Sequence, residues 1–197
     1  MKPITAVFFG RSGSGKGTQA ELLIKKLKEL DPANRVVYVE TGAELRKMKA
    51  NGTHTAKLTA EIMDKGGLMP ASIPIWAWSN LLMSEVATGK EHMVFDGVAR
   101  RADEAPILDQ ALQFYAREKP SIVFLDVPVP EVTDRLLKRG RHDDKHEKIA
   151  ERLRWFETDV MPSVHYFKKS PTCRFLEIDG HQTVEKVHAD ILKALGL

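Results

Sequence analysis

The most informative stretch of the sequence is GRSGSGKGT, residues 10–18. A short apolar run precedes it and apolar residues at helical spacing follow it, so it connects a strand to a helix. Its glycines allow positive φ angles, and backbone N–H groups at a helix N-terminus can then surround a phosphate. Lys16 is placed to reach the β- and γ-phosphates of a nucleotide. A glycine-rich turn without a ligand is the alternative, but the strand–loop–helix context favours a phosphate-binding loop.

Apolar strands and amphipathic helices alternate along the whole chain. Short runs rich in β-branched and aromatic residues predict five parallel strands, buried on both faces, at residues 6–9, 36–39, 93–95, 122–125 and 175–178. Helical spacing predicts helices over residues 19–30, 103–117, 130–139, 145–167 and 183–195. Because such alternation implies right-handed crossovers, we predict a three-layer α/β fold around a five-stranded parallel sheet.

One region interrupts this alternation. Residues 42–86 contain no strand pattern, only helical segments with breaks at residues 51–52, 66–67 and 70. The region follows the second strand, and a second irregular stretch, residues 139–145, separates two later helices. Ligands of open α/β folds bind at the carboxyl ends of the strands, so we expect the binding site between these two stretches.

Composition excludes several classes of protein. No apolar run approaches the roughly 20 residues that span a bilayer, so no membrane partner is expected. The short apolar stretch near the N-terminus leads directly into residues 10–16, which is typical of a strand that enters a loop, so no signal peptide is expected. Cys173 is the only cysteine, which excludes an internal disulfide and fits a reducing compartment such as the cytoplasm. The net charge of +3 suits an anionic ligand. However, the predicted helix at residues 19–30 carries acidic residues among its lysines, which is typical of a solvated helix face, so no nucleic-acid partner is expected. The tryptophans, residues 76, 78 and 155, are predicted to be packing residues.

The phosphate loop departs from the general motif in one place, because Gly17 stands where that motif has Ser or Thr. The run GKGTQ, residues 15–19, resembles the phosphate loop of adenylate kinases and their nucleoside monophosphate kinase relatives. Further segments resemble other motifs of this family in the same order: TGAELR (41–46), GLMP (67–70), FDGVAR (95–100), RGRHDD (139–144) and DG (179–180). The segment 95–100 lacks the family's Phe and Pro, yet the resemblance covers nearly the whole chain.

This resemblance implies a P-loop NTPase fold in a single kinase domain, residues 1–197. The implied core comprises residues 1–40, 87–138 and 145–197, with a helical insertion that binds the monophosphate at 41–86 and a short lid at 139–144. The implied reaction is reversible phosphoryl transfer from MgATP to AMP, which gives two ADP. We expect a monomer whose partners are these nucleotides.

Phosphoryl transfer needs positioning and neutralisation of charge, and arginine binds phosphates bidentately. By resemblance, the catalytic residues are Lys16, Arg100, Arg139, Arg141 and Arg152. The residues implied at ATP are Gly13, Ser14, Gly15, Lys16, Gly17, Thr18, Arg135, Arg139 and Gln182. Those implied at AMP are Thr41, Gly42, Arg46, Gly67, Met69, Gly97, Arg100, Glu104, Arg141 and Arg152. The acceptor is already an ionised phosphate, so no catalytic base is expected.

Oxygen groups at the sheet edge are candidates for holding magnesium. Asp96 ends an apolar strand, where it can hold Mg²⁺ through water near Thr18, and a cap or turn role is its alternative. Asp143 and Asp144 can equally cap the next helix or form hydrogen bonds within the lid. No zinc site is expected, because the histidine pair at residues 142 and 146 has no convincing third ligand.

The residues expected near the acceptor base point to more than one nucleotide. Thr41 and the turn at 67–70 match adenylate kinases and favour AMP, but Glu104 stands where the family usually has glutamine. An ionised glutamate can only accept hydrogen bonds, which suits guanine better than adenine, whereas a glutamate at the surface would contact no base. We predict AMP, with GMP or UMP and CMP as alternatives. A P-loop protein that binds nucleotide without catalysis is the alternative of another class, and the arginine set counts against it.

Overall fold

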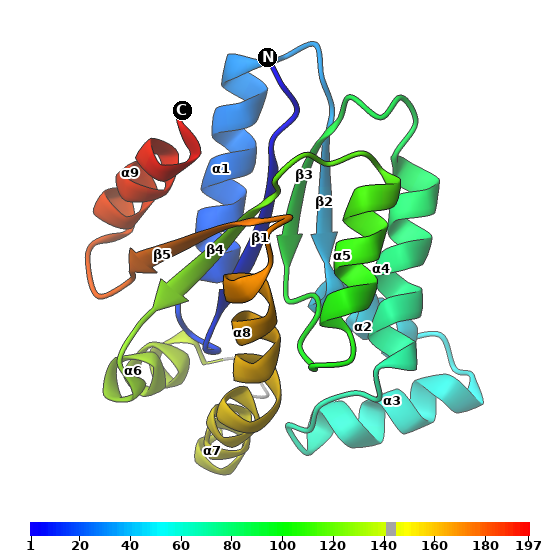
Figure 1. Ribbon diagram of the computed structural model, residues 1–197. Coiled ribbons are helices and arrows are strands. Elements are labelled where there is room, and N and C mark those ends of the chain that lie inside the picture. Colours follow the sequence, from blue (N-terminus) through cyan, green and yellow to red (C-terminus); the bar gives the residue numbers. More distant parts are fainter. Residues whose placement is uncertain (141–144) are drawn as a thin grey trace.

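The computed structural model describes residues 1–140 and 145–197. Its centre is a five-stranded sheet in which all neighbouring strands are parallel, in the order β2-β3-β1-β4-β5 (Figure 1). The strands are β1 (Thr5–Gly10), β2 (Val36–Glu40), β3 (His92–Asp96), β4 (Ser121–Asp126) and β5 (Arg174–Asp179). Because β1 is central, the loop that follows it emerges in the middle of the carboxyl edge. The predicted five-stranded parallel sheet is confirmed.

Helices cover both faces of this sheet. They are α1 (Lys16–Leu30), α2 (Thr41–Lys49), α3 (His54–Asp64), α4 (Ser72–Glu85), α5 (Ala105–Phe114), α6 (Val129–Arg139), α7 (His146–Trp155), α8 (Met161–Lys169) and α9 (Val184–Leu195). Val7 points into one apolar cluster, with residues of α4, α5 and α8, and Phe8 points into a second, with residues of α1 and α9. Successive residues of one strand thus supply opposite layers, and the predicted three-layer fold is confirmed.

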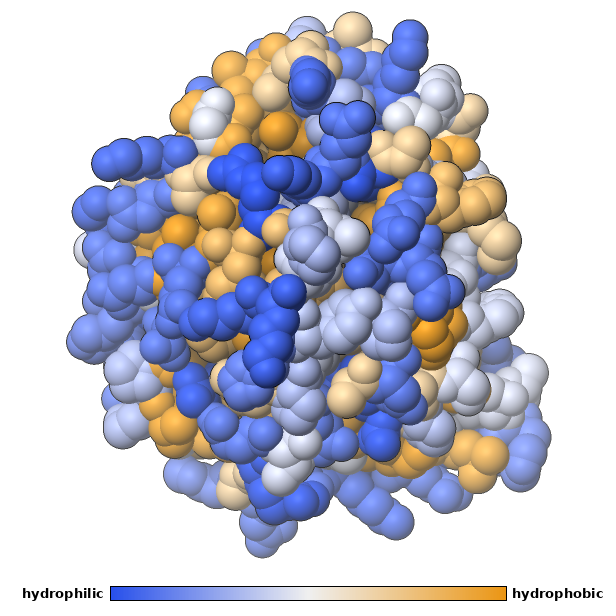
Figure 2. Space-filling model, viewed as in Figure 1, coloured by the Kyte–Doolittle hydropathy of each residue, from blue (hydrophilic) through white to orange (hydrophobic). Residues whose placement is uncertain are grey.

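In Figure 1 strands β1 to β4 point downward, toward the lower part of the molecule where α3, α6 and α7 lie, and both termini lie in the upper part. Between β2 and β3 the chain forms α2, α3 and α4 only, which confirms the predicted helical character of this region. Figure 2 shows hydrophilic side chains over most of this face, with smaller hydrophobic patches between them. Within the described residues, no helix combines the length and apolar character needed to cross a membrane.

The prediction that all strands are buried on both faces is wrong for the two edge strands. β5 exposes Arg174 and Glu177, and β2 alternates between buried and half-buried residues. An edge strand has a neighbouring strand on one side only, so the flanking helices cover it less completely.

The prediction of one helix over residues 145–167 is also wrong. A π-helical segment, Phe156–Val160, separates α7 from α8. Pro162 in the first turn of α8 has no N–H to donate to the carbonyl of Thr158, so the α-helical hydrogen-bond pattern is interrupted before it. Glu157 of this segment accepts from Arg11 of the phosphate loop at 2.7 Å, so the interruption lies against that loop.

Candidate active site

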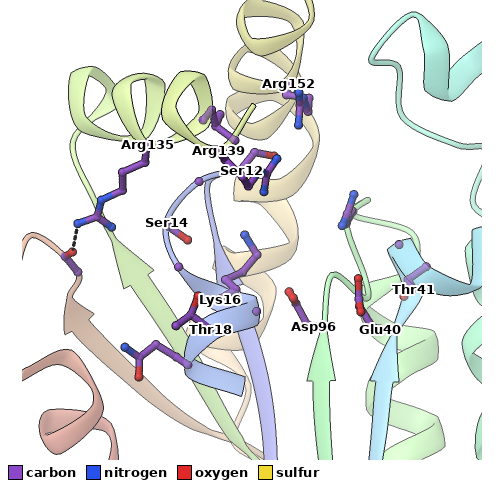
Figure 3. A pocket seen from close by; sticks show the side chains of 18 of the residues that line it. Ser12, Ser14, Lys16, Thr18, Glu40, Thr41, Asp96, Arg135, Arg139 and Arg152 are labelled. Atoms are coloured by element: carbon purple, nitrogen blue, oxygen red, sulfur yellow. Dashed lines mark hydrogen bonds between the residues drawn. The ribbon is translucent and has the colours of Figure 1, made fainter. Parts of the chain in front are cut away.

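A cavity of about 860 Å³ opens at the carboxyl edge of the sheet. The phosphate loop, α2, the turn after α3, α6 and α7 all contribute to its lining. Lys16 rises into it from the loop and Asp96 from the end of β3, while Arg139 and Arg152 face it from α6 and α7 (Figure 3). The cavity therefore lies where parallel α/β sheets bind their ligands.

The phosphate loop adopts a conformation that requires glycine. Gly13 and Gly15 have φ angles of 85° and 94°. A Cβ on Gly13 would lie 2.8 Å from Leu136 Cγ and from the carbonyl oxygen of Val132, so the loop packs directly against α6 at this residue. Gly15 immediately precedes α1, and the N-terminus of that helix, with its partial positive charge, borders the cavity.

Lys16 is held inside this loop. Its Nζ donates to the carbonyl oxygens of Gly10 at 2.8 Å and Arg11 at 2.9 Å. The pKa of Lys16 is lowered to about 8, mainly by burial; the charge of Asp96 opposes this shift and the nearby charge of Arg100 contributes to it. A buried cation that other cations disfavour is stabilised by an anion, so the electrostatics of the loop favour a phosphate ligand.

Arginines of α6 and α7 border the same side of the cavity. Arg135 donates to the carbonyl oxygen of Gly180 at 3.0 Å, which ties α6 to the turn after β5 (dashed line, Figure 3). Arg152 is buried, and its Nε donates to the carbonyl oxygen of Lys148, one turn earlier in α7, at 3.3 Å. These contacts hold both guanidinium groups at the border of the cavity.

A second group of side chains lines the opposite side. Thr41 is buried at the start of α2, and Arg46 of the same helix pairs with Glu40 at 2.6 Å. Arg100 lies in the loop after β3, where its guanidinium occupies the space that a Cβ of Gly97 would need. Gly97 also has a φ of 73°, so a glycine here lets Arg100 fold back beside the sheet edge.

Glu104 is 1% exposed and lines the cavity, so the alternative that it lies at the surface is wrong. Its Oε2 accepts from the backbone N–H of Arg100 at 3.3 Å, while its Oε1 has no hydrogen-bond partner among the described residues. Burial raises the pKa of Glu104 to about 7, against the opposing charge of Arg100. This shift makes a neutral carboxylic acid accessible to Glu104 near neutral pH, in addition to the ionised form considered above.

The donor chemistry at the end of β3 suits magnesium. Asp96 lines the cavity with Thr18, and a Cβ on Gly17 would lie 3.5 Å from Asp96 Oδ2, so the carboxylate lies against the phosphate loop. A carboxylate and a hydroxyl fit the octahedral oxygen shell of Mg²⁺ when water and phosphate oxygens complete it. Nowhere in residues 1–140 and 145–197 do three His, Cys, Asp or Glu side chains gather as a metal cluster.

Comparison with known proteins identifies the family. A family model described as Adenylate kinase matches residues 8–172. The chain belongs to the adenylate kinase family. An adenylate kinase of Leptospira biflexa is 32% identical over 194 residues, which cover 96% of this chain and 98% of that protein. The adenylate kinases of Thermosynechococcus vestitus and Phocaeicola vulgatus are each 31% identical, over 96% and 98% of this chain and equal shares of their own length.

Most site residues that the resemblance to adenylate kinases implies gather around the one cavity. Those that line it are Gly13, Ser14, Gly15, Lys16, Gly17, Thr18, Thr41, Gly42, Arg46, Gly67, Met69, Asp96, Arg100, Glu104, Arg135, Arg139, Arg152 and Gln182. Gly97 instead borders a small neighbouring cavity that Arg100 also lines. Arg141, His142, Asp143 and Asp144 lie outside the described residues.

The tryptophan predictions need correction in this member of the adenylate kinase family. Trp76 is 59% exposed on α4, so the packing prediction is wrong for it, whereas Trp78 is buried as predicted. Trp155 is buried but also lines the cavity, which the prediction of a packing residue missed. Its position three residues after Arg152 places both on one face of a helix, and that spacing was the signal available in the sequence.

Proposed function

We propose that this chain is an ATP:AMP phosphotransferase that converts MgATP and AMP reversibly into two ADP. The observation that carries the proposal is the convergence of four cationic side chains on one cavity beside a phosphate loop: Lys16, Arg100, Arg139 and Arg152. Phosphoryl transfer depends on such an arrangement, because its transition state spreads charge over the transferred group and needs little covalent help. The relatives compared above are named adenylate kinases, which supports AMP over GMP, CMP or UMP.

In this proposal the two nucleotides occupy opposite sides of the cavity. The phosphates of ATP lie on the loop formed by residues 12–18, and Arg135 and Gln182 contact the rest of ATP. AMP lies beside α2 and the turn at residues 66–69, with its phosphate bound by Arg46 and Arg100. Arginines from α6, α7 and the segment between them then surround the group in transit: Arg139, Arg141 and Arg152.

The magnesium ion belongs to the same proposal. Asp96 and Thr18 would hold it through water, and its charge would neutralise the phosphate oxygens. We further propose that residues 41–86 act as the AMP-binding insertion and residues 139–144 as a short lid, with the rest of the chain as the core. We also propose that the enzyme is a monomer, that it is located in the cytoplasm and that it has no zinc site.

A coupled assay for ADP, with ATP as donor and a panel of AMP, GMP, CMP and UMP, tests the proposed activity. We expect ADP formation to require AMP, to stop when EDTA removes magnesium and to return when Mg²⁺ is added in excess. AMP is expected to give the highest kcat/KM. Nucleotide binding without ADP formation would support the non-catalytic alternative. A higher kcat/KM with GMP than with AMP would identify GMP as the acceptor instead.

Glu104 is compatible with adenine when its neutral form is considered. A protonated carboxyl group donates through its O–H and accepts through its other oxygen, as an amide does. Adenine presents the N1 acceptor beside the N6 amino donor, so the acid form matches it, whereas the ionised form matches the two donors of guanine. Because burial raises the pKa of Glu104 to about 7, the acid form predominates below neutral pH and is lost as the pH rises through 7.

We therefore expect the acceptor preference to depend on pH. Between about pH 6 and about pH 8.5, the ratio of kcat/KM for AMP to that for GMP is expected to fall roughly tenfold, because ionisation removes the donor for adenine N1. Glu104→Gln should show a constant ratio, since an amide does not titrate. Using a ratio cancels the titration of Lys16, because ATP is the donor in both reactions.

The same substitution at an exposed glutamate, Glu118→Gln, is the matched control and should keep the pH dependence of the wild type. Charged groups that act on Glu104 are Arg100, Arg101 and Asp103, and none of them is altered by either variant. A ratio that does not change with pH in the wild type would contradict a direct contact between Glu104 and the base.

A further inference from the structure

Trp155 connects three parts of the cavity that are far apart in the sequence. It is the last residue of α7, is 6% exposed and lines the cavity. Its Nε1–H donates to the carbonyl oxygen of Gly66 at 3.0 Å, in the turn after α3. The Arg100 guanidinium lies over its indole ring, with 5.9 Å between Cζ and the ring centroid. One side chain thus joins α7, the turn that leads to α4 and the loop after β3.

The turn at Gly66 is shaped to receive this contact. Gly66 has a φ of 73°, and its N–H donates to the carbonyl oxygen of Met63 at 3.0 Å, so it ends α3 in a left-handed conformation. A Cβ on Gly66 would lie 3.2 Å from both Cβ and the carbonyl oxygen of Lys148, so the backbone of the turn lies directly against α7. The buried carbonyl of this glycine needs a donor, and the indole N–H of Trp155 supplies it.

The position of Trp155 on α7 links this contact to the arginines. Arg152 precedes it by three positions on the same helix face, so both side chains border the cavity from one side of α7. The contact between the indole ring and Arg100 is within the range of a cation–π interaction and restrains that guanidinium. The turn and Arg100 belong to the side of the cavity assigned to AMP, and neither is part of the phosphate loop.

We propose that Trp155 is a positioning residue for the acceptor nucleotide, which holds the turn at residues 66–69 and Arg100 in the geometry that binds AMP. The inference rests on the proposed function, because that function assigns AMP to this side of the cavity. A residue of this kind acts on one substrate, so its loss raises the KM for AMP and leaves ATP binding in place. A residue needed for packing alone would lower stability and leave both KM values unchanged.

Trp155→Phe tests the inference, because it keeps an aromatic ring beneath Arg100 and removes the N–H donor. The KM for AMP is expected to rise about fivefold, the effect of one lost hydrogen bond, while the KM for ATP and kcat stay within about twofold. Trp78→Phe is the matched control, since Trp78 is 1% exposed in the same apolar cluster and its Nε1 has no partner among the described residues. The control is expected to leave both KM values unchanged. Equal rises in both KM values of Trp155→Phe, or no rise with AMP, would overturn the inference.

A second measurement needs neither catalysis nor a folded Trp155→Phe protein. The chain has three tryptophans, so Trp155 is the only one left in the double variant Trp76→Phe/Trp78→Phe. Calorimetry gives the AMP concentration that saturates this variant. At that concentration AMP is expected to change the fluorescence emission of Trp155, and ATP is expected to change it less. An emission that does not respond to bound AMP would overturn the inference. A wild-type chain that forms no ADP from AMP would overturn the proposed function instead.

Discussion

Lys16→Ala is expected to lower kcat at least about 100-fold while the chain stays folded. The Lys16 ammonium is held by loop carbonyls inside the cavity, close enough to Asp96, Arg100 and Arg139 for their charges to shift its pKa. In the proposed function, charge on the transferred phosphoryl group develops in that space, and a fixed cation there would stabilise the transition state more than it would in water. Folding is expected to change little, because a cation at the N-terminus of α1 opposes the helix dipole.

The measurements are kcat with ATP and AMP and the thermal unfolding temperature of each protein. Lys25→Ala is the matched control, since it removes an exposed lysine from the same helix and is expected to keep kcat within about twofold. A folded Lys16→Ala protein with near wild-type kcat would exclude the phosphate loop lysine from the mechanism.

Arg100→Ala is expected to lower kcat/KM for AMP by about 100-fold, because the acceptor phosphate would lose a charged bidentate donor. The guanidinium is folded back over Gly97 and lies near the charges of Asp96 and Glu104, so its position is set before AMP binds. Arg100→Lys is expected to recover only part of the loss, since an ammonium group is a point charge that cannot bind two phosphate oxygens in one plane.

Arg101→Ala is the matched control for this variant. Its side chain forms ion pairs with Asp103 at 3.7 Å and Asp159 at 3.6 Å. Ion pairs at the protein surface contribute little to stability. We expect kcat/KM for AMP to stay within about twofold in this control. The KM for ATP of Arg100→Ala should also stay close to the wild-type value, and an equal rise for both nucleotides would assign Arg100 a structural role instead.

Local sequence patterns predicted the strands, most of the helices and the phosphate loop of this protein. Each of these features depends on residues within a few positions of one another, such as the glycines around Lys16 or the apolar run before them. The strand order β2-β3-β1-β4-β5 is of another kind, because its neighbours are joined by long crossovers and their pairing is settled by packing. The break between α7 and α8 depends on both kinds of information. Pro162 can be read from the sequence, but only the structure shows that the helix is interrupted before it.

The order and spacing of motifs extended prediction to single side chains of the cavity. The motifs predict Lys16, Arg100 and Arg152 as site residues, and all three line the cavity. Gly97 was also predicted, but it acts beneath Arg100 and borders a neighbouring cavity. A motif therefore indicates which residues gather at a site, whereas the part that each plays depends on where the backbone places it.

Two properties of the cavity were decided by tertiary structure alone. The pKa of Glu104 depends on how completely surrounding elements exclude water from its carboxyl group, and the same residue type at the surface would be ionised. The hydrogen bond from Trp155 to Gly66 joins residues 89 positions apart, and it exists because α7 packs against the turn after α3. Residue types and their spacing specify the phosphate loop and the cationic side chains, because backbone conformation and charge are local properties. Protonation and long-range contacts depend on solvent exclusion and helix packing, which arise only when distant segments come together.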